Sequence, residues 1–446
     1  MVDRAQRLAE GSIPSLLVSF SLPAIVGMVA QAVYNIVDRF FIGRALGPDG
    51  IAGIAVSLPF MLIILAFSML IGFGAAALVS LRLGEQKRDE AERVLGHAVV
   101  LVVLVSAVLT LVGLLFLDRW LVLFGASPQV LPYARDYLGI IVLGSVFQVG
   151  SFGLNASIRS EGNPLVAMCT LWIGVALNFA LAPLFIFVFG WGMKGAGLAT
   201  ILSQAVSLIW VVGHFMGRGS LLRLRWQNLR LSWPVCRRIM AIGSPHCVMQ
   251  LVASILNGLL NNQLSIYGGD AAISAMGVIY ATFMLILMPI FGVNQGAQPI
   301  VGFNYGARAF DRVKKAWGLA AIAASTISTA GFVVTMFFPA AVFRIFSPDD
   351  QELLQLGSHA MRVSGAMLPL IGFQIVSASY FQAVGKPKQA ILLMLSRQVL
   401  LLIPAVIVLP HFLGLNGVWL AMPFADIVSS MITAPFIYVE MRSLGK

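Results

Sequence analysis

Two acidic residues lie inside long apolar stretches of the chain, where a charged side chain is costly. The other Asp and Glu residues fall in polar stretches or near the ends of apolar ones, whereas Asp38 and Asp426 do not. Apolar surroundings favour the protonated form of a carboxylate, so such an acid can exchange a proton near neutral pH. Asp38 is therefore the first candidate for a proton-coupling group. Asp426 is a secondary candidate, and a structural hydrogen bond between helices would explain it equally well.

Three polar residues share a helical face with Asp38. Gln31, Tyr34 and Asn35 precede it by seven, four and three residues, which are spacings that bring side chains together on a helix. Pro23 lies about four helical turns earlier. A proline inside a helix removes one hydrogen bond and permits a kink. We expect Pro23 to act as a hinge on the helix that carries the acid.

Further amide side chains occur inside apolar stretches. Each of them alone is most simply a hydrogen-bonding contact between helices. As a set they predict a polar-lined cavity, to which Gln31, Tyr34 and Asn35 would also contribute. The amides are Asn155, Asn178, Asn257, Asn261, Asn262, Gln263, Gln295 and Gln298.

The sequence shows no pattern of a catalytic or metal centre. The five histidines are scattered, and the HExxH, P-loop and CxxC patterns do not occur. We therefore predict that the chain is not an enzyme and uses no metal or cofactor. The lack of a nucleotide-binding motif favours coupling to an ion gradient over ATP. His246 and the three cysteines are most simply structural.

Composition places these polar residues in a membrane. Of 446 residues, 59% are hydrophobic and 11% are charged, against about 45–50% and about 25% in soluble domains. A helix needs about 20 apolar residues to cross a bilayer, and only helices or closed barrels satisfy their backbone there. The apolar runs lack the alternation of barrel strands, so we predict an all-α membrane protein with twelve transmembrane helices. They lie near 14–41, 52–81, 96–117, 133–158, 165–189, 195–216, 236–266, 273–303, 316–341, 357–383, 390–410 and 416–438.

The two halves of the chain repeat. At an offset of 222 residues, Asn35 coincides with Asn257 and Gly47 with Gly269, and Pro23 meets a second proline. An even number of spans in each copy gives both copies the same orientation in the membrane. We therefore expect two parallel-repeat six-helix lobes with a central cleft: an N-lobe (1–217), a basic linker (218–235) and a C-lobe (236–446).

The positive charges are strongly biased to one side of the predicted spans. Of the 29 Lys and Arg residues, 21 fall in the termini and the loops on that side, and four fall on the other. The positive-inside rule then places both termini in the cytoplasm. The bias explains the net charge of +11 without nucleic acid as a partner. In the linker, apolar and basic residues interleave, which fits either a segment on the anionic inner leaflet or a plain basic loop.

Four motifs resemble the multidrug and toxic compound extrusion family, in particular its DNA-damage-inducible branch. They are YNIVDRFFIG at 34–43, IRSEGNP at 158–164, NQGAQPIVGFNYG at 294–306, and GVWLA at 417–421 followed by Asp426. The resemblance implies a two-lobed antiporter that exports cationic amphipathic compounds by alternating access in exchange for H+ or Na+. It also implies that protonation of Asp38 couples transport, that the helix bends at Pro23, and that Asn155, Asn178 and Thr200 are polar partners.

The chain departs from that family in one respect that bears on the coupling ion. Where the family often has a second acid on the fifth helix, this sequence has Ala182. The loss of a carboxylate favours H+ over Na+. The alternative function is a flippase for lipid-linked oligosaccharide or lipid II, whose cleft would need basic residues. The candidates are Arg39, Arg135, Arg362 and Arg397, which lie inside or near span ends, none of them near mid-span. We expect a monomer in the inner membrane of a prokaryote, with small molecules and the lipid bilayer as partners.

Overall fold

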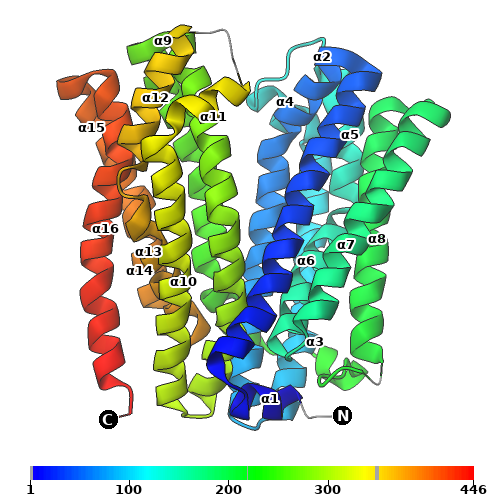
Figure 1. The fold of residues 1–446 in the computed structure, drawn as a ribbon. Helices are drawn as coiled ribbons and strands as arrows, with labels where there is room; N and C mark the ends of the chain where they lie inside the picture. The colour runs from blue at the N-terminus through cyan, green and yellow to red at the C-terminus, as the bar shows by residue number, and fades with distance from the viewer. Residues whose placement is uncertain (1–3, 218, 347–350, 446) are drawn as a thin grey trace. The chain divides into compact units, whose positions relative to one another are not determined.

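All elements of the described residues are helical (Figure 1). The computed structural model describes residues 4–217, 219–346 and 351–445, without the side chains of 4, 32–40, 48 and 346. The elements are α1 (Arg4–Glu10), α2 (Ile13–Gly84), α3 (Arg88–Leu115), α4 (Leu117–Leu123), α5 (Leu131–Leu143), α6 (Ser145–Ser160), α7 (Pro164–Pro183), η1 (Leu184–Val188), α8 (Gly192–Met216), η2 (Trp226–Leu229), α9 (Trp233–Gly306), α10 (Phe310–Phe337), α11 (Pro339–Phe346), α12 (Gln351–Gly365), α13 (Leu368–Ala383), α14 (Pro387–Leu395), η3 (Ser396–Leu402), α15 (Ile403–Leu413) and α16 (Leu415–Ser443).

Twelve membrane crossings follow from the lengths and breaks of these helices. Helices α2 and α9 have 72 and 74 residues, and at about 1.5 Å per residue each is far longer than one crossing of about 30 Å. Each breaks once, at a glycine with non-helical backbone: Gly47 (φ 65°, ψ −155°) and Gly269 (φ 62°, ψ −158°). Each long helix makes two crossings, and each of the two bent pairs described next makes one. Six further spans, Arg88–Leu115, Pro164–Val188, Gly192–Met216, Phe310–Phe337, Pro387–Leu413 and Leu415–Ser443, make one crossing each, so the described residues confirm the predicted twelve-helix fold.

Two predicted spans are bent, which the apolar pattern did not indicate. The span near 133–158 consists of α5 and α6 at 53°, and the span near 357–383 consists of α12 and α13 at 44°. At the first break, Thr110 Oγ1 of α3 donates to the carbonyl oxygen of Val142 at 3.0 Å and lies 2.9 Å from Ser145 Oγ. The Thr110 hydroxyl on the neighbouring helix thus donates a hydrogen bond to a backbone carbonyl at the bend.

The backbone repeats with the offset seen in the sequence. Besides Gly47 and Gly269, residues with positive φ recur in three further pairs at offsets of 222 or 223. One of these pairs consists of non-glycine residues, Gln86 (φ 62°) and Arg308 (φ 57°), a conformation that such residues rarely adopt. The two halves therefore fold alike down to single turns, as the predicted parallel repeat requires. The other pairs are Gly162 with Gly385 and Gly192 with Gly414.

The chain divides into two compact units, each built mostly from one half. Unit 1 comprises Met1–Gly11 and Val26–Gln250, and unit 2 comprises Ser12–Ile25 and Leu251–Lys446. The first part of α2 therefore belongs to the unit formed by the second half, and the first part of α9 belongs to the unit formed by the first half. Pro23 precedes the first division by two residues and has helical backbone.

Glycines allow these exchanged helix parts to pack closely within each unit. In unit 1, a Cβ on Gly243 of α9 would lie 1.7 Å from the carbonyl oxygen of Leu70 in α2. In unit 2, a Cβ on Gly296 of α9 would lie 2.6 Å from the backbone nitrogen of Ser21 in α2. Ser21 and Gly243 are related by the offset of 222, so the equivalent position packs closely against the other long helix in both units. Only glycine permits backbones to approach this closely.

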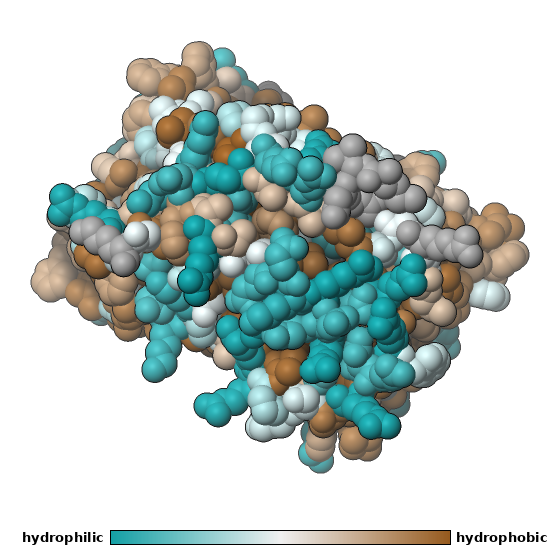
Figure 2. Space-filling view, turned by 90° about the horizontal axis from the view of Figure 1, so that it is seen from below, coloured by the Kyte–Doolittle hydropathy of each residue, from teal (hydrophilic) through white to brown (hydrophobic). Residues whose placement is uncertain are grey.

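Apolar side chains cover much of the outside of both units, as a bilayer requires. Leu111, Ile209, Ile322 and Met431 are each at least 60% exposed on long helices. Hydrophilic side chains gather on the face seen from below Figure 1 (Figure 2). The ends of the helices on this face thus fit the boundary between lipid and water.

Candidate functional site

Three of the predicted site residues lie outside the described residues. The side chains of Tyr34, Asn35 and Asp38 are among residues 32–40, so their contacts stay predictions. Gln31, one turn before them on α2, is exposed. Its exposure places a polar group on the accessible surface of the helix that carries the predicted coupling acid.

Two predicted coupling residues meet in the interior of unit 1. Asn178 of α7 and Thr200 of α8 are only 1% and 2% exposed. Asn178 Nδ2 donates to Thr200 Oγ1 at 3.4 Å, and Thr200 Oγ1 donates to the carbonyl oxygen of Ala196 at 3.1 Å. Ala182 is one turn after Asn178 and fully buried, and the π-helix η1 begins two residues later. Single π-turns inside helices occur frequently at functional sites.

Asn155 adds a buried amide to unit 1. It lies on α6 and is 3% exposed, and its Oδ1 has no hydrogen-bond partner among the described residues. A buried amide oxygen without a partner is costly. The position can therefore accept a hydrogen bond from a water molecule or a ligand.

In unit 2, the predicted cavity residues lie on α9. Asn257 and Asn261 are four residues apart, so they share a helical face, and both are exposed. Gln295, on the part of α9 after Gly269, is half-buried. Amide groups exposed within a spanning segment avoid hydrocarbon by lining a water-filled space. The three residues thus fit an aqueous cavity better than a lipid-facing surface.

Asp426 forms an ion pair that sequence reasoning missed. Arg397 Nε of η3 donates to Asp426 Oδ1 of α16 at 2.6 Å, and the two side chains are 25% and 2% exposed. Arg397 lies seven residues into the apolar run predicted near 390–410 and ten residues into the helical span Pro387–Leu413. Spacing of charges within one span cannot reveal a partner that lies 29 residues away.

Three acids that the apolar pattern assigns to loops or span ends are buried. Glu161 at the end of α6, Glu92 in the first turns of α3 and Glu440 near the end of α16 are 0%, 1% and 8% exposed. Glu440 accepts hydrogen bonds from Lys386 Nζ at 2.6 Å and from Tyr380 Oη at 3.3 Å. The sequence gives only a weak indication that these three acids are buried, because acids near helix ends are usually exposed to water.

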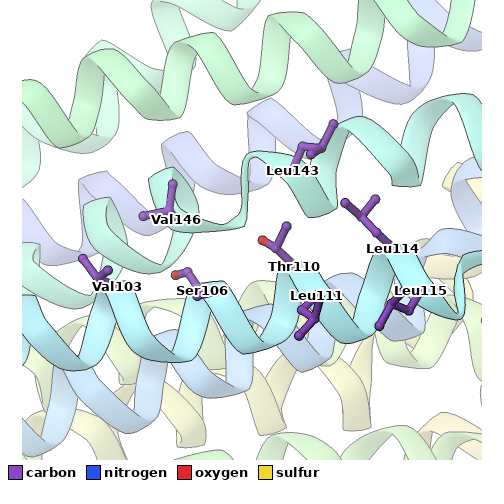
Figure 3. A pocket seen from close by; sticks show the side chains of 9 residues that line it. Val103, Ser106, Thr110, Leu111, Leu114, Leu115, Leu143 and Val146 are labelled. Carbon is purple, nitrogen blue, oxygen red and sulfur yellow. The ribbon is translucent and has the colours of Figure 1, made fainter.

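One pocket among the described residues carries little of this chemistry (Figure 3). It is an open groove of about 680 Å³ between α3 and the bend of α5 and α6. Ser106 and Thr110 are its polar lining residues. Leu111 and Leu143, which also line it, are 60% and 58% exposed. Such a groove fits lipid chains, so we place no transport site there.

Comparisons with known proteins agree with the repeated architecture. The MatE family model matches residues 23–184 and 245–407, two stretches at offsets of 222 and 223. The multidrug export protein MepA of Staphylococcus haemolyticus (strain JCSC1435) is 25% identical over 434 residues, which cover 97% of this chain and 95% of that protein. MepA of Staphylococcus aureus (strain NCTC 8325 / PS 47) is 26% identical, with coverages of 95% and 93%.

Solved structures show the same fold. A structure of the MATE multidrug transporter DinF-BH in complex with a small molecule is 38% identical, with a TM-score of 0.91 and coverage of 99% of this chain and 98% of that one. An outward-facing multidrug resistance MATE transporter of the MOP superfamily is 24% identical with a TM-score of 0.93. The match covers 100% of this chain and 99% of that one.

Proposed function

Because this chain belongs to the MatE family of membrane transporters, we propose that it is a secondary active multidrug efflux antiporter. It exports cationic amphipathic compounds in exchange for H+, with Na+ as the less favoured ion. The observation that carries the proposal is full-length similarity to proteins described as multidrug exporters or transporters, one of them 38% identical and described in complex with a small molecule. The exposed amides on α9 support a polar path through the bilayer.

The proposed coupling step is protonation of Asp38. A deprotonated Asp38 attracts a cationic substrate, and protonation removes the charge and releases the cation. Alternating access between the N-lobe (1–217) and the C-lobe (236–446) carries the substrate across, with Pro23 as a hinge on the helix of Asp38. The monomer works in the inner membrane with both termini in the cytoplasm.

Proton coupling is favoured by the surroundings of Asn178. A sodium site needs several oxygen ligands and, preferably, negative charge. The Thr200 hydroxyl accepts a hydrogen bond from the Asn178 amide and donates one to a backbone carbonyl. One turn after Asn178 on α7, the buried side chain is the methyl group of Ala182. This part of unit 1 therefore provides the neutral hydroxyl oxygen of Thr200, which already has two hydrogen-bond partners.

The test is transport of ethidium and of a cationic rhodamine dye into everted vesicles, with a pH gradient or a Na+ gradient imposed separately. We expect the wild type to respond to the pH gradient and Asp38→Asn to lose at least tenfold in rate. Asp118→Asn is the control, since Asp118 is half-exposed and pairs with Arg135 at 3.3 Å. Amounts of folded protein are matched by size-exclusion chromatography.

Other outcomes would contradict specific parts of the proposal. Efflux driven by the Na+ gradient alone would overturn the inference from Ala182. Normal efflux by Asp38→Asn would move the coupling site, with Asp426 as the next candidate. Flipping of a labelled lipid-linked oligosaccharide, without export of either dye, would favour the flippase.

A further inference from the structure

The segment between α8 and α9 is held at the level where several membrane helices end. This linker segment, defined here as residues 219–238, follows Met216 at the end of α8 and includes the first turns of α9. It is drawn in green at the bottom of Figure 1, beside the start of α3. Since α8, α9 and α3 are all spanning helices, the segment runs along the membrane boundary of unit 1.

A buried carboxylate anchors the first part of the segment. Glu161, at the end of α6, accepts hydrogen bonds from Ser220 Oγ at 2.5 Å and from the backbone nitrogens of Leu221 and Leu222 at 3.0 and 3.2 Å. Its other carboxylate oxygen contacts His214 Nε2 of α8. Glu161 is thus enclosed by the segment that it holds, and its charge is not available at the surface.

Helix α3 anchors the rest of the segment. Glu92 Oε1 accepts a hydrogen bond from the backbone nitrogen of Arg223 at 3.2 Å. Glu92 Oε2 lies 3.3 Å from Arg225 Nε. His97 Nε2, one turn further along α3, accepts the backbone nitrogen of Ser232 at 2.9 Å. Glu92 and His97 are both buried, so these contacts fix which face of the segment points outward.

The outward face combines tryptophans with arginines. Trp226, Leu231 and Trp233 are 87%, 58% and 64% exposed. The segment contains no acidic residue, and both anchoring acids lie beneath it. The exposed arginines are Arg223, Arg225, Arg230, Arg237 and Arg238.

We propose that this face is a docking surface for anionic phospholipid headgroups. Tryptophan concentrates at the boundary between hydrocarbon and water, where its ring is apolar and its N–H is solvated. Guanidinium groups bind phosphate with two parallel hydrogen bonds. The apolar outer surface of α8 leads to the segment, with Trp210 44% and Met216 71% exposed. Apolar anchors, cationic charge and a fixed position at the boundary together match an anionic leaflet.

The test uses the full chain in nanodiscs of phosphatidylcholine, alone or mixed with phosphatidylglycerol. Lipids with a nitroxide on the headgroup quench nearby tryptophan fluorescence. The fluorescence of the linker segment is obtained as the difference between the wild type and the variant Trp226→Phe/Trp233→Phe. We expect this difference signal to be quenched by the headgroup label, and more strongly with phosphatidylglycerol. Each arginine near a charged surface contributes about fivefold in binding. The triple variant Arg230→Gln/Arg237→Gln/Arg238→Gln should therefore retain at least tenfold less phosphatidylglycerol after purification.

A matched control removes exposed basic residues from unit 2. Arg308→Gln/Lys315→Gln/Lys388→Gln should keep its phosphatidylglycerol. Quenching by aqueous acrylamide but not by the lipid label would show that the face points to water and would overturn the proposal. Equal quenching in both lipid mixtures, with an unaffected triple variant, would mean apolar insertion and would overturn anionic recognition. Both readouts are independent of transport, so failure here leaves the antiporter proposal untouched.

Discussion

We expect different roles for the two acids inside the spans, Asp426 and Asp38. Asp426 has a cationic partner, Arg397, at 2.6 Å, and the pair is neutral as a whole. Asp38 is the residue that we propose to change charge during transport. The ion pair joins η3 to α16, so a structural role explains Asp426.

Removing one member of this pair should destabilise the protein more than removing both charges. Asp426→Asn leaves a cation without its partner, and the loss for a fully buried pair is roughly 3–5 kcal/mol; because Arg397 is 25% exposed, we expect less. The double variant Asp426→Asn/Arg397→Gln should recover most of this loss. Thermal unfolding in detergent measures both. A folded double variant without efflux would contradict a structural role and make the pair part of the transport machinery.

Breaks in the long helices are determined by glycine backbone conformation. Gly269 divides α9 at φ 62° and ψ −158°, a combination that is essentially restricted to glycine. Gly47 divides α2 with nearly the same angles. Since the break sets where one crossing ends and the next begins, a single residue in each half determines the path of two spans.

Alanine at the break should cost stability through backbone conformation alone. A Cβ on Gly269 would meet nothing within 4 Å, so steric contact is excluded and Gly269→Ala should lose about 1–3 kcal/mol. Gly277→Ala is the matched control on the same helix. Its Cβ would also meet nothing within 4 Å, but its backbone is helical, so it should be neutral or gain up to about 1 kcal/mol. Equal unfolding midpoints for both variants would refute the argument.

At the scale of the whole molecule, the repeat and the charge bias predict one topology. Six crossings per half place both termini on the same side, and the side rich in Lys and Arg faces the cytoplasm. Gln227 in the linker segment and Gln129 between α4 and α5 are exposed residues on opposite predicted sides.

Cysteine labelling on intact cells can test this topology. With Cys169, Cys236 and Cys247 replaced by alanine, a membrane-impermeant maleimide should label Gln129→Cys directly. Gln227→Cys should react only after the cells are permeabilised. The reverse labelling pattern would show that the protein has the opposite orientation in the membrane, with the linker segment at the outer leaflet.

The sequence by itself determined the all-α membrane class, the twelve spans and the repeat. These properties depend on the length of apolar runs and on residue spacing, which are local along the chain. The motifs around Asp38 and at 294–306 further indicated the family that the MatE model then matched. The assignment of Asp38 itself, together with Tyr34 and Asn35, stays a prediction.

Only the tertiary structure decided which polar groups meet. Arg397 and Asp426, or Glu161 and Ser220, are 29 and 59 residues apart, and no spacing rule joins residues on different helices. The bend between α5 and α6 likewise contacts the hydroxyl of Thr110, which α3 supplies across the packing interface. Such contacts follow from how the helices pack, because packing decides which buried polar groups come within hydrogen-bond distance of one another.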